Sequence, residues 1–314
     1  MKEILSKLFR EIEHDIGTRE LNTLVFESLI GAIKNFEFKD VESFKIAFEK
    51  IIEDISSTEP KISIVIDHCC ELYHHFLKIL NTHQTSNFTA EHIIEELIKR
   101  AEQVKHKDAK ARIKLLQNAG DFLDIENKKI LIYDHSHTVQ DVLIYLKNEG
   151  KHFNVIIAEQ DLEKTEENIA SLHSAKIPFK VVPAYMLSYY DDEVDMLFFG
   201  ALTFKNTYDF VLDTGSLALI SEFHLSNKAT YLFMTTSKFA LWKSEKKTEI
   251  FTHPHFRKHS KKEIEYQRMK FSHDRVPSDL FSKIITDEGV FSPDELKKLY
   301  DQKFEKCQGK VLGN

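Results

Sequence analysis

Between Lys129 and Trp242, short apolar runs alternate with amphipathic runs of helical length. Five of the apolar runs have the length of strands and are continuous rather than alternating in polarity: residues 130–133, 155–158, 179–182, 196–199 and 230–234. Such strands are typical of a parallel sheet that helices cover on both faces. The alternation therefore predicts an α/β fold with a Rossmann-like parallel sheet. Any ligand site is expected at the carboxyl ends of the strands.

The part of the chain before this alternation predicts helices only. Up to about residue 118, glycine occurs only at positions 17 and 31, and apolar residues recur at spacings of three and four. The change in pattern falls near Gly120. We therefore expect an all-helical N-terminal domain over residues 1–120 and a Rossmann-like C-terminal domain over residues 121–314.

Charge and composition exclude several classes of protein. The net charge of −7 does not favour a nucleic-acid partner, so no direct nucleic-acid binding is expected. No apolar run approaches the roughly 18–20 residues that span a bilayer, so no membrane partner is expected either. The three cysteines form neither a disulfide framework nor a metal-binding spacing. These features predict a cytoplasmic protein.

The turn after the first predicted strand carries the polar residues that best suit a ligand. They are consecutive and lead into a helix: His135, Ser136, His137 and Thr138. Hydroxyls, imidazoles and free backbone N–H groups at such a turn can hold an anion such as a phosphate. The alternative is that Ser136 or Thr138 only caps the helix. The turn has no glycine run, which excludes a dinucleotide fingerprint and a P-loop, and no cofactor is expected.

Three later turns supply further candidate residues. Gly200, at the end of the fourth predicted strand, lets a ligand or another part of the chain approach closely. Asp213, Gly215 and Ser216 precede the next helix, where they either meet a ligand or start that helix. Lys238 follows the fifth strand and offers a point charge to a phosphate.

Sixteen histidines raise the question of a metal site. None of their clusters has the spacing of a zinc motif, so no metal is expected. His253 and His255 precede a basic run at residues 257–262, within a polar stretch (243–263) that we interpret as a surface excursion. A solvated loop is the expectation for the basic run, and an RNA-facing role is the alternative.

The order of these motifs along the chain matches one known family of proteins. Together, they resemble the superfamily of translation initiation factor 2B regulatory subunits (alpha, beta and delta), which also contains methylthioribose-1-phosphate isomerase and ribose-1,5-bisphosphate isomerase. The matching segments are residues 130–139, 194–201, 213–216, 237–239, 276–280, 284–290 and 293. The resemblance covers about residues 128–296, and implies a helical N-terminal domain and association through the C-terminal domain.

The sequence departs from the isomerase members at their catalytic positions. Ser136 stands where they have a cysteine, and Leu202 stands where they have an aspartate. A serine without a base is a poor proton-transfer group, and leucine cannot transfer protons. Their phosphate-clamping arginine is missing from residues 159–162, and Asp213 replaces a lysine.

These departures favour a non-catalytic, initiation-factor-2B-like protein with a regulatory or assembly role, without catalytic residues. The implied partner is a second copy or related subunits, bound through the C-terminal domain. If a sugar phosphate or nucleotide is sensed, it is expected to contact His135, Ser136, His137, Thr138, Gly200, Asp213, Gly215, Ser216 and Lys238. The alternative is a diverged sugar-phosphate isomerase with a relocated base such as His135, His137 or Asp213.

Overall fold

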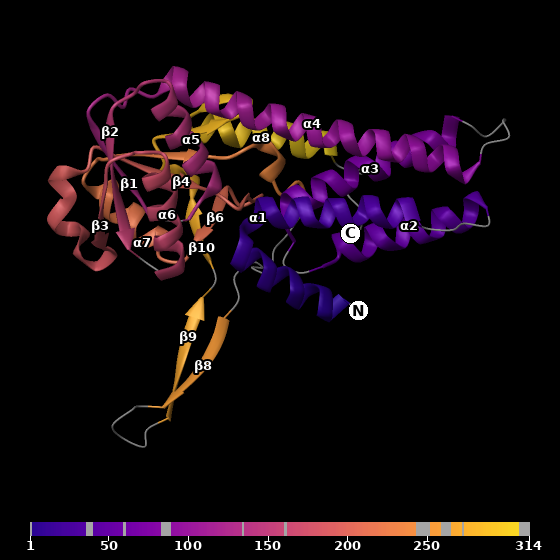
Figure 1. Cartoon of the computed structure of the whole chain (residues 1–314), viewed down its shortest axis with the longest axis horizontal. Helices are drawn as coiled ribbons and strands as arrows, with labels where there is room; N and C mark the ends of the chain where they lie inside the picture. Colours follow the sequence, from indigo (N-terminus) through magenta and orange to yellow (C-terminus); the bar gives the residue numbers. More distant parts are fainter. Residues whose placement is uncertain are drawn as a thin grey trace. The chain divides into compact units, whose positions relative to one another are not determined.

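The computed structural model describes residues 2–35, 40–58, 61–82, 89–133, 135–159, 162–242, 252–258, 265–271 and 273–307. Internal contacts divide the chain into two compact units. The helical unit comprises residues 1–112, 237–242 and 301–314, and the α/β unit comprises residues 113–236 and 243–300. The predicted fold class is confirmed, since a helical N-terminal region precedes a mostly parallel sheet with helices (Figure 1).

The helical unit is built on four long helices: α1 (Lys2–Asn35), α2 (Val41–Ser56), α3 (Ser63–Thr82) and the first part of α4 (Ala90–Phe122). A capping box starts α2, in which Asp40 Oδ1 accepts a hydrogen bond from Ser43 N at 2.7 Å. The buried rings of Phe44, Phe48 and Phe76 meet between α2 and α3, with centroids 5.0–5.8 Å apart.

Helix α4 continues without a break from Ala90 to Phe122, so the predicted boundary at residue 120 falls in its last turn. That boundary stays a prediction. Among the described helices, none combines the length and apolar character needed to span a membrane.

The α/β unit contains a seven-stranded sheet in the order β12-β11-β7-β4-β1-β2-β3. Six strands run parallel, and β12 pairs antiparallel with β11. The strands are β1 (Lys128–Ile132), β2 (Phe153–Glu159), β3 (Phe179–Pro183), β4 (Met196–Gly200), β7 (Ala229–Phe233), β11 (Lys283–Thr286) and β12 (Gly289–Phe291). All five strands expected from the apolar runs are present. Every residue of β4 is buried, as expected for a central strand covered on both faces.

The helical segments that follow these strands are α5 (His137–Asn148), α6 (Leu162–Ser174), the 3-10 helix η1 (Ala184–Glu193), α7 (Ser216–Leu225) and the 3-10 turn η2 (Thr236–Lys238). After a further 3-10 turn, η3 (Ser278–Leu280), the last two strands lead to α8 (Pro293–Cys307). Ser292 caps the start of α8, because Glu295 N donates to Ser292 Oγ at 3.4 Å and Pro293 takes the first helical position.

Two smaller sheets were not predicted. The first has three antiparallel strands in the order β10-β6-β5, formed by β5 (Thr203–Phe204), β6 (Asp209–Asp213) and β10 (His273–Pro277). The second is a two-stranded ribbon of β8 (Thr252–Lys258) and β9 (Glu265–Phe271), drawn in orange in Figure 1. The solvated loop expected for the basic run at residues 257–262 is therefore wrong for residues 257 and 258, which end strand β8. The rest of that stretch lies outside the described residues.

Candidate functional site

The carboxyl ends of β1, β4 and β6 carry eight of the nine residues predicted to meet a ligand. His135 and Ser136 follow β1, Gly200 ends β4, and Asp213 ends β6. Strands β1 and β4 are parallel neighbours, with Ile132 opposite Phe198, so the segments that follow them start at the same edge of the sheet. This is the edge at which open α/β sheets bind ligands.

Ser136 fills the place next to Gly200. It is the N-cap of α5, and its hydroxyl accepts a hydrogen bond from Val139 N at 3.4 Å. A β-carbon at position 200 would overlap the Ser136 hydroxyl oxygen and lie 2.8 Å from its β-carbon. The capping alternative is thus what the structure shows for Ser136. Gly200 is needed because this side chain packs directly on its Cα.

The two histidines of the first turn contact each other. The ring centroids of His135 and His137 lie 5.0 Å apart, with an interplanar angle of 78°. Gln140 Nε2 lies 3.3 Å from His135 Nδ1 and donates to Asn168 Oδ1 of α6 at 3.3 Å. Thr138 is half-buried in the first turn of α5.

The environment of His135 favours its neutral form. Burial lowers the pKa of its imidazole below the ordinary value, and His137 and Lys164 lower it further, whereas Glu167 and Asp213 raise it. A neutral imidazole at neutral pH cannot attract a phosphate by charge. Within the described part of the chain, no group of three or more histidine, cysteine or acidic side chains is arranged to hold a metal ion.

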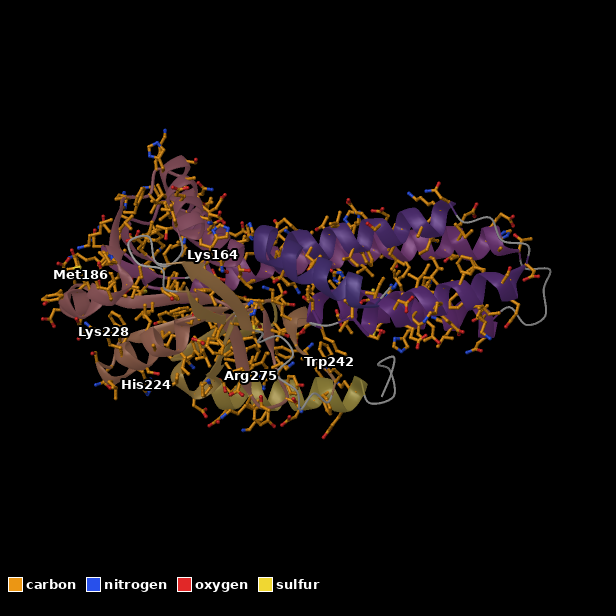
Figure 2. The ribbon with its side chains drawn as sticks, turned by 90° about the horizontal axis from the view of Figure 1, so that it is seen from below. Lys164, Met186, His224, Lys228, Trp242 and Arg275 are labelled. Atoms are coloured by element: carbon orange, nitrogen blue, oxygen red, sulfur yellow. The ribbon has the colours of Figure 1, made fainter. Side chains whose placement is uncertain are left out.

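Lys164 of α6, labelled in Figure 2, forms an ion pair with Asp213. Its Nζ lies 2.6 Å from Asp213 Oδ2, and the two side chains are 27% and 11% exposed. Sequence reasoning identified Asp213 as a reversal of charge but missed Lys164. No sequence motif marks Lys164 on α6, and only the packing of α6 brings its side chain to the end of β6.

The start of α7 holds a carboxylate from the protein itself. The backbone N–H groups of Gly215 and Leu217 donate to Asp274 Oδ2 of β10, at 2.8 and 3.1 Å. A helix N-terminus attracts anions through its free N–H groups and its dipole, and Asp274 satisfies both. The backbone N–H groups of residues 215 and 217 therefore already bind an internal anion, which sequence reasoning missed. Residues 215–216 stay a predicted ligand position.

Gly215 and Ser216 are fixed by local packing. Gly215 has a φ of +98°, and a β-carbon there would lie 3.0 Å from Tyr133 Cζ and overlap its hydroxyl. The same hydroxyl donates to Thr214 O at 2.8 Å. Ser216 is fully buried, and its hydroxyl has no hydrogen-bond partner within the described structure.

Lys238 belongs to a different unit from the other eight residues. It ends η2, is half-buried, and lies in the segment 237–242 that groups with the helical unit. The neighbouring Thr236 is held by the acidic turn after β11, since its N–H donates to Asp287 Oδ1 at 2.7 Å and its hydroxyl donates to Glu288 Oε1 at 3.0 Å. That turn thus has a structural role at the start of η2.

The model of the initiation factor 2 subunit family matches residues 16–293. The chain belongs to this family. A relative in Pyrococcus furiosus, described as translation initiation factor eIF-2B subunit 2-like, is 25% identical over 219 residues, which cover 69% of this chain and 73% of the relative. The resemblance inferred from the sequence motifs is confirmed.

Solved structures of low sequence identity share the fold of this family member. The translation initiation factor eIF-2B of Pyrococcus horikoshii superposes with a TM-score of 0.72 at 17% identity, covering 93% of this chain and 98% of that chain. A chain of the tetrameric eIF2B-beta2-delta2 complex of C. thermophilum gives 0.71 at 14% identity, with 96% and 95% covered. The 5-methylthioribose 1-phosphate isomerase of P. horikoshii gives 0.66 at 15%, with 96% and 87% covered.

The fold is thus common to initiation-factor subunits and to an isomerase, and the side chains must distinguish them. At the second departure from the isomerase pattern, Leu202 is half-buried and its N–H donates to Val211 O of β6 at 3.0 Å. Its side chain offers no group that could transfer a proton.

Proposed function

We propose that this chain is a non-catalytic, regulatory or assembly subunit of the initiation-factor-2B type. It acts in the cytoplasm as a homodimer or as part of a hetero-oligomer, and associates through residues 121–314. The occurrence of a structural neighbour within a tetrameric eIF2B-beta2-delta2 complex supports an oligomer.

The observation that carries the proposal is the structural role of the Ser136 side chain. Its hydroxyl caps α5 and packs on Gly200, so it serves a structural purpose at the position where the isomerase members have their cysteine. A nucleophile or acid needs a base within hydrogen-bond reach, and Leu202 supplies none.

The charges of the site support the same proposal. Lys164 pairs with Asp213 at the end of β6, and the N-terminus of α7 binds Asp274. Both features could otherwise hold a phosphate group, and each already has an internal counter-charge. A sugar phosphate must therefore displace an ion pair or a carboxylate in order to bind.

Sedimentation velocity of the full-length protein at low micromolar concentration tests the assembly role. A dimer, or a larger complex when related subunits are added, is the expected result. A monomer that remains alone at every concentration and ignores related subunits would contradict the proposal.

A thermal-shift screen tests whether a ligand is sensed. Sugar phosphates and nucleotides are compared with inorganic phosphate as the control. A ligand present at 100 times its dissociation constant adds about 2.7 kcal/mol to the free energy of unfolding, which is readily detected. A shift specific to one compound would assign a sensing role to the site, and a flat screen would leave assembly as the function.

The neutral imidazole of His135 favours one alternative, a diverged sugar-phosphate isomerase. A base that is unprotonated at neutral pH and lies beside a second histidine could replace the missing carboxylate. Turnover of ribose-1,5-bisphosphate or methylthioribose-1-phosphate that is lost in His135→Ala would establish this function. Absence of turnover with both substrates would exclude the two reactions.

A further inference from the structure

The 3-10 helix η1, which connects β3 to β4, is fixed to the α/β unit along one side. A 3-10 helix has three residues per turn, so every third residue lies on the same side. On the inner side, Leu187 is buried, and Lys180 Nζ lies 4.1 Å from the centroid of the Tyr190 ring. Glu193 ends this side and accepts hydrogen bonds from Lys129 Nζ and Lys180 Nζ, both at 2.9 Å. Burial and charge therefore hold η1 in one orientation.

The remaining residues of η1 are turned outward and form a surface that we call the η1 face. Tyr185 and Tyr189 are 87% and 81% exposed, and Tyr185 is the most exposed of the large hydrophobic side chains that the structure describes. Met186, labelled in Figure 2, is partly exposed beside them. The spacing of three arranges the η1 face in two rows: Tyr185, Ser188 and Asp191, and Met186, Tyr189 and Asp192. Each row thus combines a tyrosine with a carboxylate.

The carboxylates of the η1 face have no cation of their own. Neither Asp191 nor Asp192 forms an ion pair with the described residues, whereas Glu193 on the inner side is paired with two lysines. Asp191 Oδ1 is buried and accepts no hydrogen bond from the described residues, and a buried acceptor in this state costs free energy until a donor reaches it. The sequence of η1 contains no lysine or arginine. A cation that neutralises this face must therefore come from elsewhere.

We propose that the η1 face binds an arginine-containing segment of a protein partner. The guanidinium group of arginine stacks on aromatic rings and forms two parallel hydrogen bonds with a carboxylate, and each row of the face offers both groups. The inner side of η1 already combines the same contacts, since Lys180 lies over the ring of Tyr190 and pairs with Glu193. Tyrosines on a fixed element lose little conformational freedom on binding, so they are effective contact residues.

The dimensions of the η1 face suit a short segment better than a whole subunit. Residues 185 to 192 are seven steps apart, which at about 2.0 Å a step is roughly 14 Å, the length of about four extended residues. The two tyrosines supply roughly 300–500 Å² of contact surface, about half of the 800 Å² or so that a stable interface takes from each partner. The expected occupant is therefore an extended segment of about four to six residues with arginines on one side.

The charge of the η1 face disfavours the other occupants. Nucleic acids and anionic lipids would be repelled by Asp191 and Asp192. A second copy that docked through the same face would place these carboxylates opposite their equivalents, and like charges across an interface are unfavourable. The arginine-containing partner is additional to the related subunits of the proposed function. A chain that stays monomeric could still bind it, so the two proposals fail independently.

Fluorescence anisotropy of the full-length protein with a labelled peptide of about six alternating arginine and leucine residues tests the proposal, since this length covers the face in extended form. We expect saturable binding that weakens as salt is added. The same peptide with lysine in place of arginine should bind about fivefold more weakly, because lysine lacks the planar group that stacks and forms paired hydrogen bonds.

The tyrosines are tested by two variants. Tyr185→Ser/Tyr189→Ser removes both rings and should weaken binding of the arginine peptide about tenfold, because it removes the surface on which guanidinium groups stack. Tyr185→Phe/Tyr189→Phe keeps the rings and should retain the wild-type affinity within about threefold. Both positions are exposed, so neither variant is expected to unfold the protein, and thermal unfolding checks this.

The carboxylates are tested against a matched control. Asp191→Asn/Asp192→Asn should weaken binding about fivefold and reduce its salt dependence. The control, Asp121→Asn/Asp124→Asn, removes the same charge from two exposed positions of the α/β unit outside the η1 face. It should keep the wild-type affinity within about twofold, because separated surface charges are largely screened by salt.

Three results would overturn the proposal. The first is no saturable binding of the arginine peptide at concentrations up to about 1 mM. The second is an equal loss of affinity in the two aspartate variants, which would mean attraction by the net charge alone. The third is unchanged binding in Tyr185→Ser/Tyr189→Ser, or equal affinity for the arginine and lysine peptides, since either would mean that no guanidinium group stacks on this face.

Discussion

Ser136 and Gly200 are in direct contact across the carboxyl ends of β1 and β4, and a β-carbon on residue 200 would lie 2.8 Å from that of Ser136. We therefore expect Gly200→Ala to lower the free energy of unfolding by about 1–3 kcal/mol, the usual effect of overpacking a core. Urea denaturation measures the change.

Ser136→Gly should restore most of this loss in the double variant, because glycine removes the clashing atoms and is tolerated at an N-cap. Gly31→Ala is the control. A β-carbon there meets nothing within 4 Å, and the change should stabilise α1 by roughly 0.5–1 kcal/mol. Equal destabilisation by both alanines would show that the contact with Ser136 is not the cause.

The carboxylate of Asp274 at the start of α7 gives the second prediction. Asp274→Ala should cost about 1–2 kcal/mol of stability, because the N–H groups of Gly215 and Leu217 lose a charged acceptor. The same variant should gain a thermal shift with inorganic phosphate that the wild type lacks, since a free helix N-terminus binds anions. Asp279→Ala, which removes a carboxylate that pairs with Lys297 at the surface, should change stability by less than about 1 kcal/mol and gain no phosphate response.

The ion pair between Lys164 and Asp213 gives the third prediction. Lys164→Met should destabilise the protein, because it leaves the carboxylate of Asp213 largely buried and without this cation. The double variant Lys164→Met/Asp213→Leu should lose less than the sum of the two single variants. A coupling free energy of about 1–3 kcal/mol is expected from the double-mutant cycle in urea. Additive effects would mean that the pair contributes nothing specific.

The parts of the fold that follow from local pattern could be predicted. The five buried strands are continuous apolar runs, and the start of α8 has a serine cap and a proline at the first helical position. The contact of Gly200 with another part of the chain also follows, since a glycine at a strand end permits close approach.

The parts that depend on distant packing could not be predicted. Asp274 reaches the N-terminus of α7 from a strand 59 residues away in the sequence, and Lys164 reaches Asp213 across 49 residues. The β8–β9 ribbon was missed for a different reason. Pro254 breaks the pattern of an ordinary strand, although proline is compatible with an edge strand, and both strands of this ribbon are edges.

Asp67 of α3 gives the fourth prediction, a dependence of stability on pH. Burial raises the pKa of its carboxyl from 3.8 to about 6. Glu71 and Asp108 also raise the pKa, while Lys107 and Lys303 lower it. The folded state therefore binds a proton on Asp67 more tightly than the unfolded chain does.

The sign of the effect follows from proton linkage. The stability that protonated Asp67 contributes is fully present below about pH 4 and is lost as the pH rises to about 6. Asp67→Asn keeps the shape and removes the charge, so it should stabilise the protein by about 1–3 kcal/mol near pH 7.5 and by almost nothing near pH 4. Urea denaturation at the two pH values measures the difference. The reverse order, with the larger gain at low pH, would show that Lys107 and Lys303 outweigh burial and that Asp67 is held as a carboxylate.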